Sequence, residues 1–424
     1  MRIGCKLLVM AVLAGYMVLL APEAPAAEGM SAAQLVQIAL EVNPQVRATH
    51  AQWMSALHSI KQNYAPSDPV VGFLNGDSPT NGFTNASINS YTVTDSFQFP
   101  GKALLQGETA KRAANIAHLA YLIAIRDTRA QTETAYYQLV LDSELAGVEA
   151  ANIVSLKQVL KVTQVAYSAG SVTQSDFLSA EFDLAAARQQ LRAFQVSEQN
   201  DETTLNQLLY RPPDEPLEVQ RKLEIEPLKT PLDNLVTLAS RARQEILQAA
   251  LSERNSQTAL KLAKFEYAPD YTLGYTFDHF FVPSFAPRPS DTQDHGFSIS
   301  FNVPVFFWLK QDEDVTRAKY DLEAARDNLD LLKSQTAAIV TTLYRNDRFA
   351  YQTAMLYKES LMPLANQGFQ VALVAYESGK IDFPALAAAL GRIYDSRTAY
   401  LQASNQFLAN EIALEQAIGE PLPK

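Results

Sequence analysis

Cysteine is almost absent from this 424-residue chain, and the only one is Cys5. It lies in a basic start that leads into the apolar residues 7–20 and then into the small residues Ala24-Pro25-Ala26. This order is typical of a secretory signal peptide, so we predict that residues 1–27 are removed on export. The exported chain then carries neither a disulfide nor a lipid on cysteine, and packing must stabilise it.

Long hydrophobic runs and an excess of positive charge are also missing. No run of 18 apolar residues follows the signal, so no transmembrane helix is expected. If the chain crosses a membrane, it must do so with strands that close into a barrel. The signal holds two basic residues and one acidic residue, so the net charge of −11 becomes −12 without it. An acidic chain without a basic stripe argues against a nucleic-acid partner.

Motifs of catalysis and cofactor binding are lacking as well. The five histidines form no H-E-x-x-H pattern, and the sequence has no G-x-S-x-G, no Walker loop and no G-x-G-x-x-G. We therefore expect no enzyme, no catalytic residues, no cofactor and no metal site.

What the sequence does contain is a long internal repeat. Three motifs recur after 203, 204 and 209 residues, namely Tyr64-Ala65-Pro66 as Tyr267-Ala268-Pro269, Phe97-Gln98-Phe99-Pro100 as Phe301-Asn302-Val303-Pro304, and Ala166-Tyr167-Ser168-Ala169-Gly170 as Ala375-Tyr376-Glu377-Ser378-Gly379. Offsets this long indicate duplication of a whole architecture rather than a solenoid repeat. We divide the exported chain into residues 28–217 and 218–424, which are expected to intertwine as one elongated unit.

Each half is predicted to start with a helix and a pair of strands. The first helix should run from Ser31 to about Asn63, with Pro44 as a break or as the start of a second segment. Strands are expected at 70–74 and 91–99, and again at 271–277 and 297–303. Six bulky residues of the second pair should share one face that contacts lipid: Tyr271, Leu273, Tyr275, Phe297, Ile299 and Phe301. A half-buried soluble sheet would show the same alternation.

Each strand pair leads into a long helical pattern. Pro100, Gly101 and Pro304 mark the strand–helix junctions, since proline cannot continue a sheet ladder. Residues 102–167 contain no proline and would span about 100 Å as one helix. In the second half, residues with 4-3 spacing predict a supercoiled seam: Ala318, Leu322, Ala325, Leu329, Leu332, Thr336 and Ile339. A plain coiled-coil rod is the alternative explanation for this spacing.

Together these features resemble the TolC-type outer-membrane efflux proteins over nearly the whole exported chain. The resemblance rests on the duplicated plan, on Asn43-Pro44, on Phe97-Gln98-Phe99-Pro100-Gly101-Lys102 and on the motif Tyr167-x-x-Gly170-x-x-x-x-x-Asp176. The Pro-Gly-Lys junction is similar to that of heavy-metal efflux members.

The resemblance implies a mainly helical fold with a small transmembrane β part. Three chains would form a twelve-stranded β-barrel in the outer membrane of a Gram-negative bacterium and an α-helical barrel in the periplasm. A periplasmic adaptor and an inner-membrane transporter of the RND type would complete the pathway. From the strands alone, four per chain cannot close a barrel, and eight would leave a filled interior. Physical arguments allow a barrel of either twelve or sixteen strands, and the resemblance selects twelve.

The resemblance also points to residues at the helix turns. The adaptor-contact candidates are Tyr167, Gly170, Tyr376 and Gly379, although these residues could simply reverse the chain. Asp176 and Asp382 are candidates for an acidic ring at the pore entrance, with a solvated acid at a helix start as the alternative. We also expect an aromatic belt at the membrane interface, with core aromatics as the alternative: Phe280, Phe281, Phe306, Phe307 and Trp308.

The sequence therefore predicts an outer-membrane channel subunit that acts as a passive exit duct gated at its periplasmic end. A periplasmic coiled-coil scaffold or adaptor that never inserts into the membrane is the rival interpretation.

Overall fold

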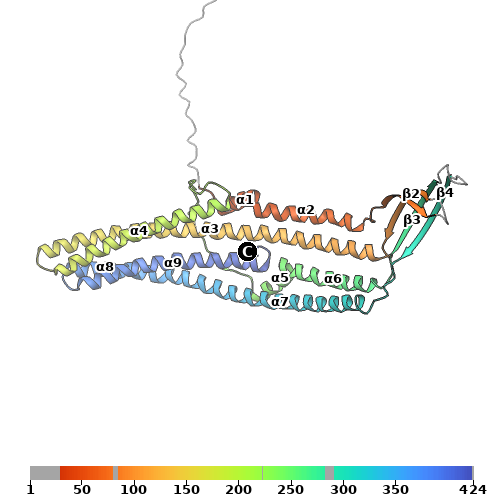
Figure 1. The fold of residues 1–424 in the computed structure, drawn as a ribbon. Helices are drawn as coiled ribbons and strands as arrows, with labels where there is room; N and C mark the ends of the chain where they lie inside the picture. The colour runs from red at the N-terminus through yellow and green to blue at the C-terminus, as the bar shows by residue number, and fades with distance from the viewer. Residues whose placement is uncertain (1–28, 80–84, 222, 282–290, 423–424) are drawn as a thin grey trace, which may run out of the picture.

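A computed structural model describes residues 29–79, 85–221, 223–281 and 291–422 (Figure 1). It is a long rod of helices with a small sheet at one end. The predicted signal peptide, residues 1–27, lies outside the described residues. The elements of the first repeat are α1 (Ala32–Val42), α2 (Pro44–Tyr64), β1 (Val70–Pro79), β2 (Asn85–Phe97), α3 (Lys102–Ser168) and α4 (Gln174–Leu208).

The second repeat follows the same plan, but a π-helix interrupts its long helix. Its elements are α5 (Leu232–Ala242), α6 (Gln244–Phe265), β3 (Tyr271–Phe281), β4 (Asp291–Phe301), α7 (Gln311–Leu356), the π-helix η1 (Tyr357–Leu361), α8 (Met362–Glu377) and α9 (Phe383–Ile418). The predicted duplicated architecture is confirmed. The exact boundary between the halves stays a prediction.

The first helix is broken where Pro44 predicts a break. Asn43 has an extended backbone (φ −62°, ψ 121°), and its side-chain oxygen accepts the N–H of Gln45 at 2.8 Å, while Pro44 opens α2. Arg243 takes nearly the same backbone angles (φ −60°, ψ 120°) between α5 and α6, although glutamine follows it instead of proline. The second repeat therefore has the same helix break without a proline after it.

The four strands form one antiparallel sheet in the order β1-β2-β3-β4. Val93 lies opposite Val71 on one side and opposite Tyr275 on the other, and Tyr275 lies opposite Phe297. All four strands reach further into the predicted loops than the alternation indicates. Among the described residues, the outer edges of β1 and β4 have no further strand beside them.

The rod consists of two long helical hairpins that lie side by side (Figure 1). At 67 residues, α3 is about 100 Å long. Small residues such as Ala110, Ala114 and Ala124 are buried along it, which lets helices approach closely. At the far end of the rod, Val159 and Ala180 of the first hairpin pack with Tyr376 and Leu386 of the second.

The second hairpin contains a π-helical turn that the sequence analysis misses. The N–H of Met362 bonds the carbonyl of Tyr357, five residues back. Pro363 follows, and its ring has no N–H to donate and would clash with a carbonyl four residues earlier in a regular α-helix. The wider turn relieves this clash, so Pro363 explains the interruption.

Candidate functional site

One face of the sheet is apolar and uncovered. The six residues predicted to contact lipid lie on this face, because residues directly opposite each other across the strands project to the same side: Tyr271 faces Phe301, Leu273 faces Ile299, and Tyr275 faces Phe297. Phe297 is 86% exposed. In the described part of the chain, the strands make no substantial packing contacts with the helices. A half-buried soluble sheet would cover this face, so the single chain does not fit that alternative.

The apolar face continues across the first strand pair. Phe73 and Tyr91 pack with their ring centres 5.0 Å apart, and Tyr91 also contacts Phe277 at 6.1 Å. Asp95 interrupts the pattern, because it lies opposite Leu273 and its Oδ1 atom has no hydrogen-bond partner among the described residues. The band of aromatic and branched side chains therefore crosses all four strands, and Asp95 and His295 are polar residues within it.

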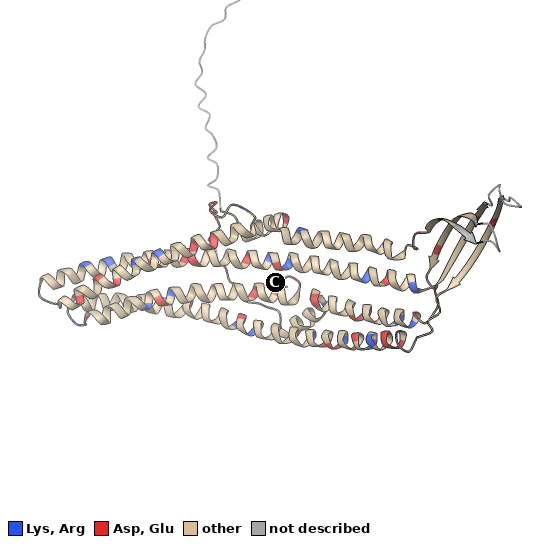
Figure 2. Cartoon of the chain, in the orientation of Figure 1, with Lys and Arg blue, Asp and Glu red and all other residues tan. Residues whose placement is uncertain are grey.

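The opposite face of the sheet carries mainly small and polar residues, with Val70, Leu74, Ile88 and Phe280 as apolar exceptions. Gly72 and Gly274 leave room there for the side chains of Thr92 and Ser298, which a Cβ atom at either glycine would overlap. Figure 2 shows that the described strands carry acidic residues but no lysine or arginine. This two-sided chemistry is what a strand between lipid and water requires.

A buried lysine forms ion pairs at the first strand–helix junction. Gly101 adopts a left-handed backbone (φ +104°), and a Cβ atom there would lie 3.1 Å from the ring of Phe265. The next residue, Lys102, is buried, and its Nζ atom donates to Asp270 at 2.9 Å and to Glu266 at 3.3 Å. Sequence analysis singles out Gly101 but misses the function of Lys102, because its partners lie more than 160 residues away.

The residues predicted to form an aromatic belt lie at the two ends of the sheet rather than in one row, and their position at a membrane interface stays a prediction. Phe280 and Phe281 end β3 at the tip of the sheet away from the helices. Phe306, Phe307 and Trp308 follow β4 at the other end, between the sheet and α7. The two groups of aromatic residues are therefore separated by the whole length of β4.

The predicted turn glycines do reverse the chain. Gly170 (φ +75°) and Gly379 (φ +69°) both take the left-handed conformation. The next residues close the turns, since the N–H of Ser171 bonds the carbonyl of Ala166 at 2.9 Å and that of Lys380 bonds Ala375 at 2.8 Å. Nothing lies within 4 Å of a Cβ atom built on either glycine, so backbone conformation rather than space selects glycine there.

The two tip tyrosines differ in environment. Tyr167 is 42% exposed and stacks on Phe177 with ring centres 5.9 Å apart. Tyr376 is only 6% exposed, and its hydroxyl donates to Thr163 of the other hairpin at 3.3 Å. Burial of Tyr376 between the hairpins argues against its predicted contact with an adaptor. Tyr167 remains exposed and stays the candidate for that contact.

Both candidate pore acids cap helices. Asp176 accepts the N–H of Thr173 at 3.0 Å, and the Thr173 hydroxyl accepts the N–H of Asp176 at 3.2 Å, which is a capping box at the start of α4. Asp382 accepts the N–H of Ala385 at 3.1 Å at the start of α9. Helix capping explains why acids occur here, and a pore role for either remains a prediction.

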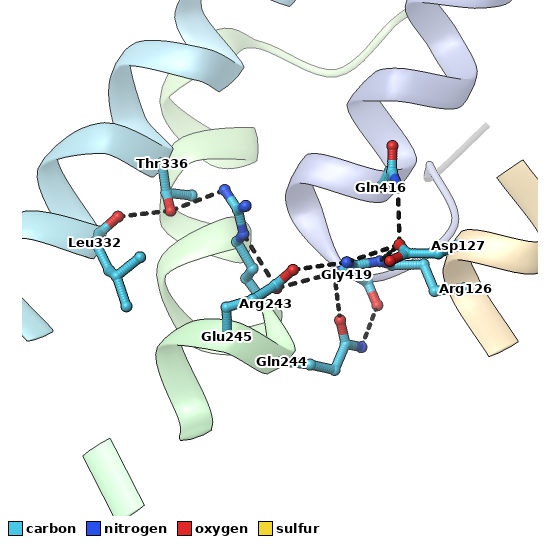
Figure 3. A network of polar contacts seen from close by, with 9 residues as sticks. All are labelled: Arg126, Asp127, Arg243, Gln244, Glu245, Leu332, Thr336, Gln416 and Gly419. Atoms are coloured by element: carbon cyan, nitrogen blue, oxygen red, sulfur yellow. Dashed lines mark hydrogen bonds and ion pairs between the residues drawn. The ribbon is translucent and has the colours of Figure 1, made fainter. Parts of the chain in front are cut away.

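A polar network joins the two repeats in the middle of the rod (Figure 3). Arg126 of α3 binds the carboxylate of Glu245 through two bonds of 2.6 and 2.9 Å, and it also contacts Asp127 at 2.9 Å. Gln416 of α9 donates to Asp127 at 2.8 Å. Burial alone would raise the pKa of Glu245, but its hydrogen bonds, above all those from Arg126, lower it to about 2.

The same network stabilises the break between α5 and α6, which no proline marks in the sequence. Arg243 donates to the Thr336 hydroxyl at 3.0 Å, and the Gln244 side chain donates to the carbonyl of Gly419 at 2.8 Å (Figure 3). Gly419 (φ +90°) comes so close that a Cβ atom would lie 2.8 Å from the Cα of Arg243. Side-chain bonds and a close glycine thus replace the proline of the first repeat.

Two further acids on the helices have raised pKa values, and Asp347 is buried whereas Asp201 is half-buried. Burial raises the pKa of Asp347 to about 6, and neither of its oxygens has a hydrogen-bond partner in the described part of the chain. Burial, together with a hydrogen bond and repulsion from Asp142, raises the pKa of Asp201 to about 7. These acids are absent from the predicted site because a single acid in a helical seam gives no sequence signal.

No helix in the described ranges has the length and hydropathy to cross a bilayer. Within the same ranges, no three His, Cys, Asp or Glu side chains form a metal-binding group.

Comparison with known proteins gives a consistent set of matches. The family model for outer membrane efflux proteins matches residues 35–209 and 235–420. The outer-membrane channel OprN superposes with a TM-score of 0.78 at 18% identity, covering 92% of this chain and 90% of that chain. VceC from Vibrio cholerae gives 0.76 at 16% identity over 92% and 97%, and CusC gives 0.76 at 13% over 92% and 92%. At these identities the solved structures show a shared fold. No curated protein sequence matches the chain.

Proposed function

The chain belongs to the outer membrane efflux protein family, and from this premise we propose that it is the outer-membrane channel subunit of a tripartite efflux system. Its structural relatives are channels rather than enzymes. The chain is a passive duct, so it needs no catalytic residue and no cofactor. Energy comes from the inner-membrane partner.

The observation that carries this proposal is the open sheet. Both edge strands lack a partner among the described residues, and the apolar face is uncovered. The uncovered apolar face is unfavourable in water, and the unpaired strand edges are unfavourable in lipid, so one isolated chain is stable in neither. Three copies that pair β4 of one chain with β1 of the next make a twelve-stranded barrel, with the band around Tyr275 and Phe297 toward lipid and the small polar face toward the lumen.

The rod then extends into the periplasm and ends at the turns of Gly170 and Gly379. We place the contact with the periplasmic adaptor at this end, with Tyr167 as the exposed aromatic side chain. The inner-membrane transporter is of the RND type, and the Pro100-Gly101-Lys102 junction favours the heavy-metal branch of the family. Asp176 and Asp382 contribute negative charge at the entrance while they cap their helices.

Cell fractionation tests the proposal. The exported chain should remain with the detergent-extracted outer membrane and run as a trimer that dissociates on heating. A periplasmic scaffold would instead wash off with salt as a soluble species. A soluble chain that is monodisperse without detergent contradicts the proposal.

A further inference from the structure

A cleft lies between the two helical hairpins in the half of the rod that ends at the turns. Residues of α3 and α4 from the first hairpin and of α9 from the second line it, and these helices run along one another (Figure 1). Its volume of about 390 Å³ is within the range of about 300–1,000 Å³ that small-molecule sites occupy. The cleft is therefore large enough to hold an organic molecule.

One end of this cleft carries a buried acid. Glu149 of α3 is only 2% exposed, and it accepts a hydrogen bond from the side-chain nitrogen of Asn152 at 3.1 Å. Burial and a hydrogen bond to Glu149 raise the pKa of Tyr394 of α9 to about 12, so the tyrosine keeps its proton and donates a hydrogen bond to the acid. Polar side chains from both hairpins thus converge on this end of the cleft.

A second acid lines the same cleft. Asp183 of α4 is half-buried, and burial raises the pKa of its carboxyl group. Among the described residues that line the cleft, none is lysine, arginine or histidine. Burying an acid without a counter-charge is unfavourable, so a bound cation would supply the charge that the lining of the cleft does not.

The rest of the lining is largely apolar. Leu156, Phe383 and Leu390 line the cleft, and they belong to the hydrophobic cluster that joins the hairpins. Gly391 lines it too, and nothing lies within 4 Å of a Cβ atom built on this glycine. A ligand with an apolar body and a positive charge would complement both kinds of surface.

The duplicated architecture provides an internal comparison for these acids. Residues of α4 and α9 correspond at an offset of 209 residues, as the helix caps Thr173 and Asp382 show. At this offset Arg392 stands in place of Asp183, and it lines a second cleft that η1, α8 and α9 form. Because a basic residue occupies the equivalent position, the helical plan alone does not require an acid there. The acidic lining belongs to the cleft between the hairpins.

We propose that the cleft between the hairpins binds an organic ammonium ion, namely a protonated amine that carries an apolar body. The ammonium group donates to the carboxyl oxygens of Glu149, and the apolar body lies along Leu156 and Leu390. Asp183 adds negative charge to the same cleft. This site goes beyond a passive duct, which needs no binding site of its own.

Calorimetric titration of the full-length, detergent-solubilised trimer with phenethylamine tests the proposal. Phenethyl alcohol has nearly the same shape without the charge and is the neutral comparison. At neutral pH the amine should bind saturably, and the alcohol should bind about tenfold more weakly or worse, because only the amine forms a charged hydrogen bond. Glu149→Gln keeps the oxygen that accepts from Asn152 but removes the charge, so it should weaken binding of the amine to the level of the alcohol.

Two leucine variants distinguish binding in the cleft from binding elsewhere. Gly391→Leu places a side chain in the cleft and should abolish binding of both compounds. Gly147→Leu is the matched control on α3, because a Cβ atom there also meets nothing within 4 Å, and its binding should equal that of the wild type. Asp183→Arg gives the half-buried position the charge of the second repeat and should weaken amine binding, which keeps the charge test available if Glu149→Gln does not assemble.

Equal binding of the amine and the alcohol would overturn the proposal. Amine binding that Gly391→Leu leaves unchanged would overturn it as well, and so would a trimer that forms but shows no saturable binding of the amine. Each of these results leaves the proposed channel intact, because membrane fractionation and trimer formation test the channel separately.

Discussion

The Nζ atom of Lys102 lies 2.9 Å from the Oδ1 atom of Asp270, and that same oxygen accepts the backbone N–H of Phe99 at 2.7 Å. Phe99 and Lys102 leave the sheet in the first repeat, and Asp270 enters it in the second. The bond therefore joins the repeats where the sheet meets the rod. A flexible joint there would let the sheet tilt against the helices, so this ion pair sets their relative direction.

Replacing Lys102 with methionine should destabilise this joint. The lysine side chain is only 3% exposed, and its loss leaves Asp270 and Glu266 close together without a counter-charge. We expect a loss of about 2 kcal/mol, less than for a fully buried pair, because both acids keep access to water. Thermal unfolding of the detergent-solubilised trimer measures it. Lys333→Met, which removes an exposed pair with Asp330, should change the midpoint little. Equal effects of the two variants would contradict the assigned role.

Gly419→Ala should disturb the break between α5 and α6. Its φ of +90° is costly for alanine, and the new methyl group would meet the backbone of Arg243 at 2.8 Å. We expect a loss of about 2–4 kcal/mol from the two effects together. Gly147→Ala is the matched control within α3, where nothing lies within 4 Å, and it should stabilise the chain by up to about 1 kcal/mol. If Gly419→Ala unfolds at the wild-type temperature, the close contact is not present in solution.

Asp347 should make stability depend on pH near neutrality. Its folded-state pKa of about 6 lies above the ordinary 3.8, so the folded chain binds the proton more tightly than the unfolded chain. Stability is therefore fully present below about pH 4 and is lost as pH rises through 6, by about 2–3 kcal/mol for this 1%-exposed side chain. Asp347→Asn should be more stable than wild type at pH 8, with a smaller difference at pH 4. Unfolding midpoints measured across this pH range test the prediction, with Asp330→Asn as the exposed control on α7. If the difference between Asp347→Asn and wild type does not grow with pH, Asp347 is solvated and the prediction is wrong.

The entrance charge of Asp176 can be separated from its capping role. Asp176→Asn keeps an oxygen that accepts the N–H of Thr173 but removes the charge, whereas Thr173→Ala weakens the cap and keeps the charge. If three copies of Asp176 line the pore, the asparagine variant should lose divalent-cation block in planar-bilayer recordings, and Thr173→Ala should retain it. Unchanged block in Asp176→Asn would leave Asp176 as a helix cap only.

Sequence reasoning predicts the elements of this fold well where the signal is local. Pro44, the alternation in β3 and β4, and the glycines at 170 and 379 each act through the backbone within a few residues, and the structure agrees with them. The predicted seam in α7 holds from Ala318 to Thr336 but then fails, because Ile339 is 43% exposed and Val340 is fully buried. The helix continues its 3.6-residue period there, so the buried stripe moves by one residue.

Features that depend on distant partners could not be predicted. In the sequence, Lys102 looks like an ordinary lysine in the first turn of a helix, and only the structure shows that Asp270 lies beside it. Arg243 looks like a helix-interior residue, since its break is held by Thr336 and Gly419 from other helices. Tyr376 and Tyr167 occupy equivalent motif positions, and only the packing of the two hairpins makes one of them buried.

The central claim is that β1 and β4 of different chains pair to close a barrel, and cysteine crosslinking tests it most directly. In one chain these strands are separated by β2 and β3, about 14 Å in total, which is too far for a disulfide. The exported chain has no native cysteine, so Val71→Cys can be combined in turn with Phe297→Cys, Ile299→Cys or Phe301→Cys. At least one pair should yield disulfide-linked species of up to three chains in outer-membrane preparations, whereas each single cysteine should not. A chain that stays monomeric with every pair would contradict the account.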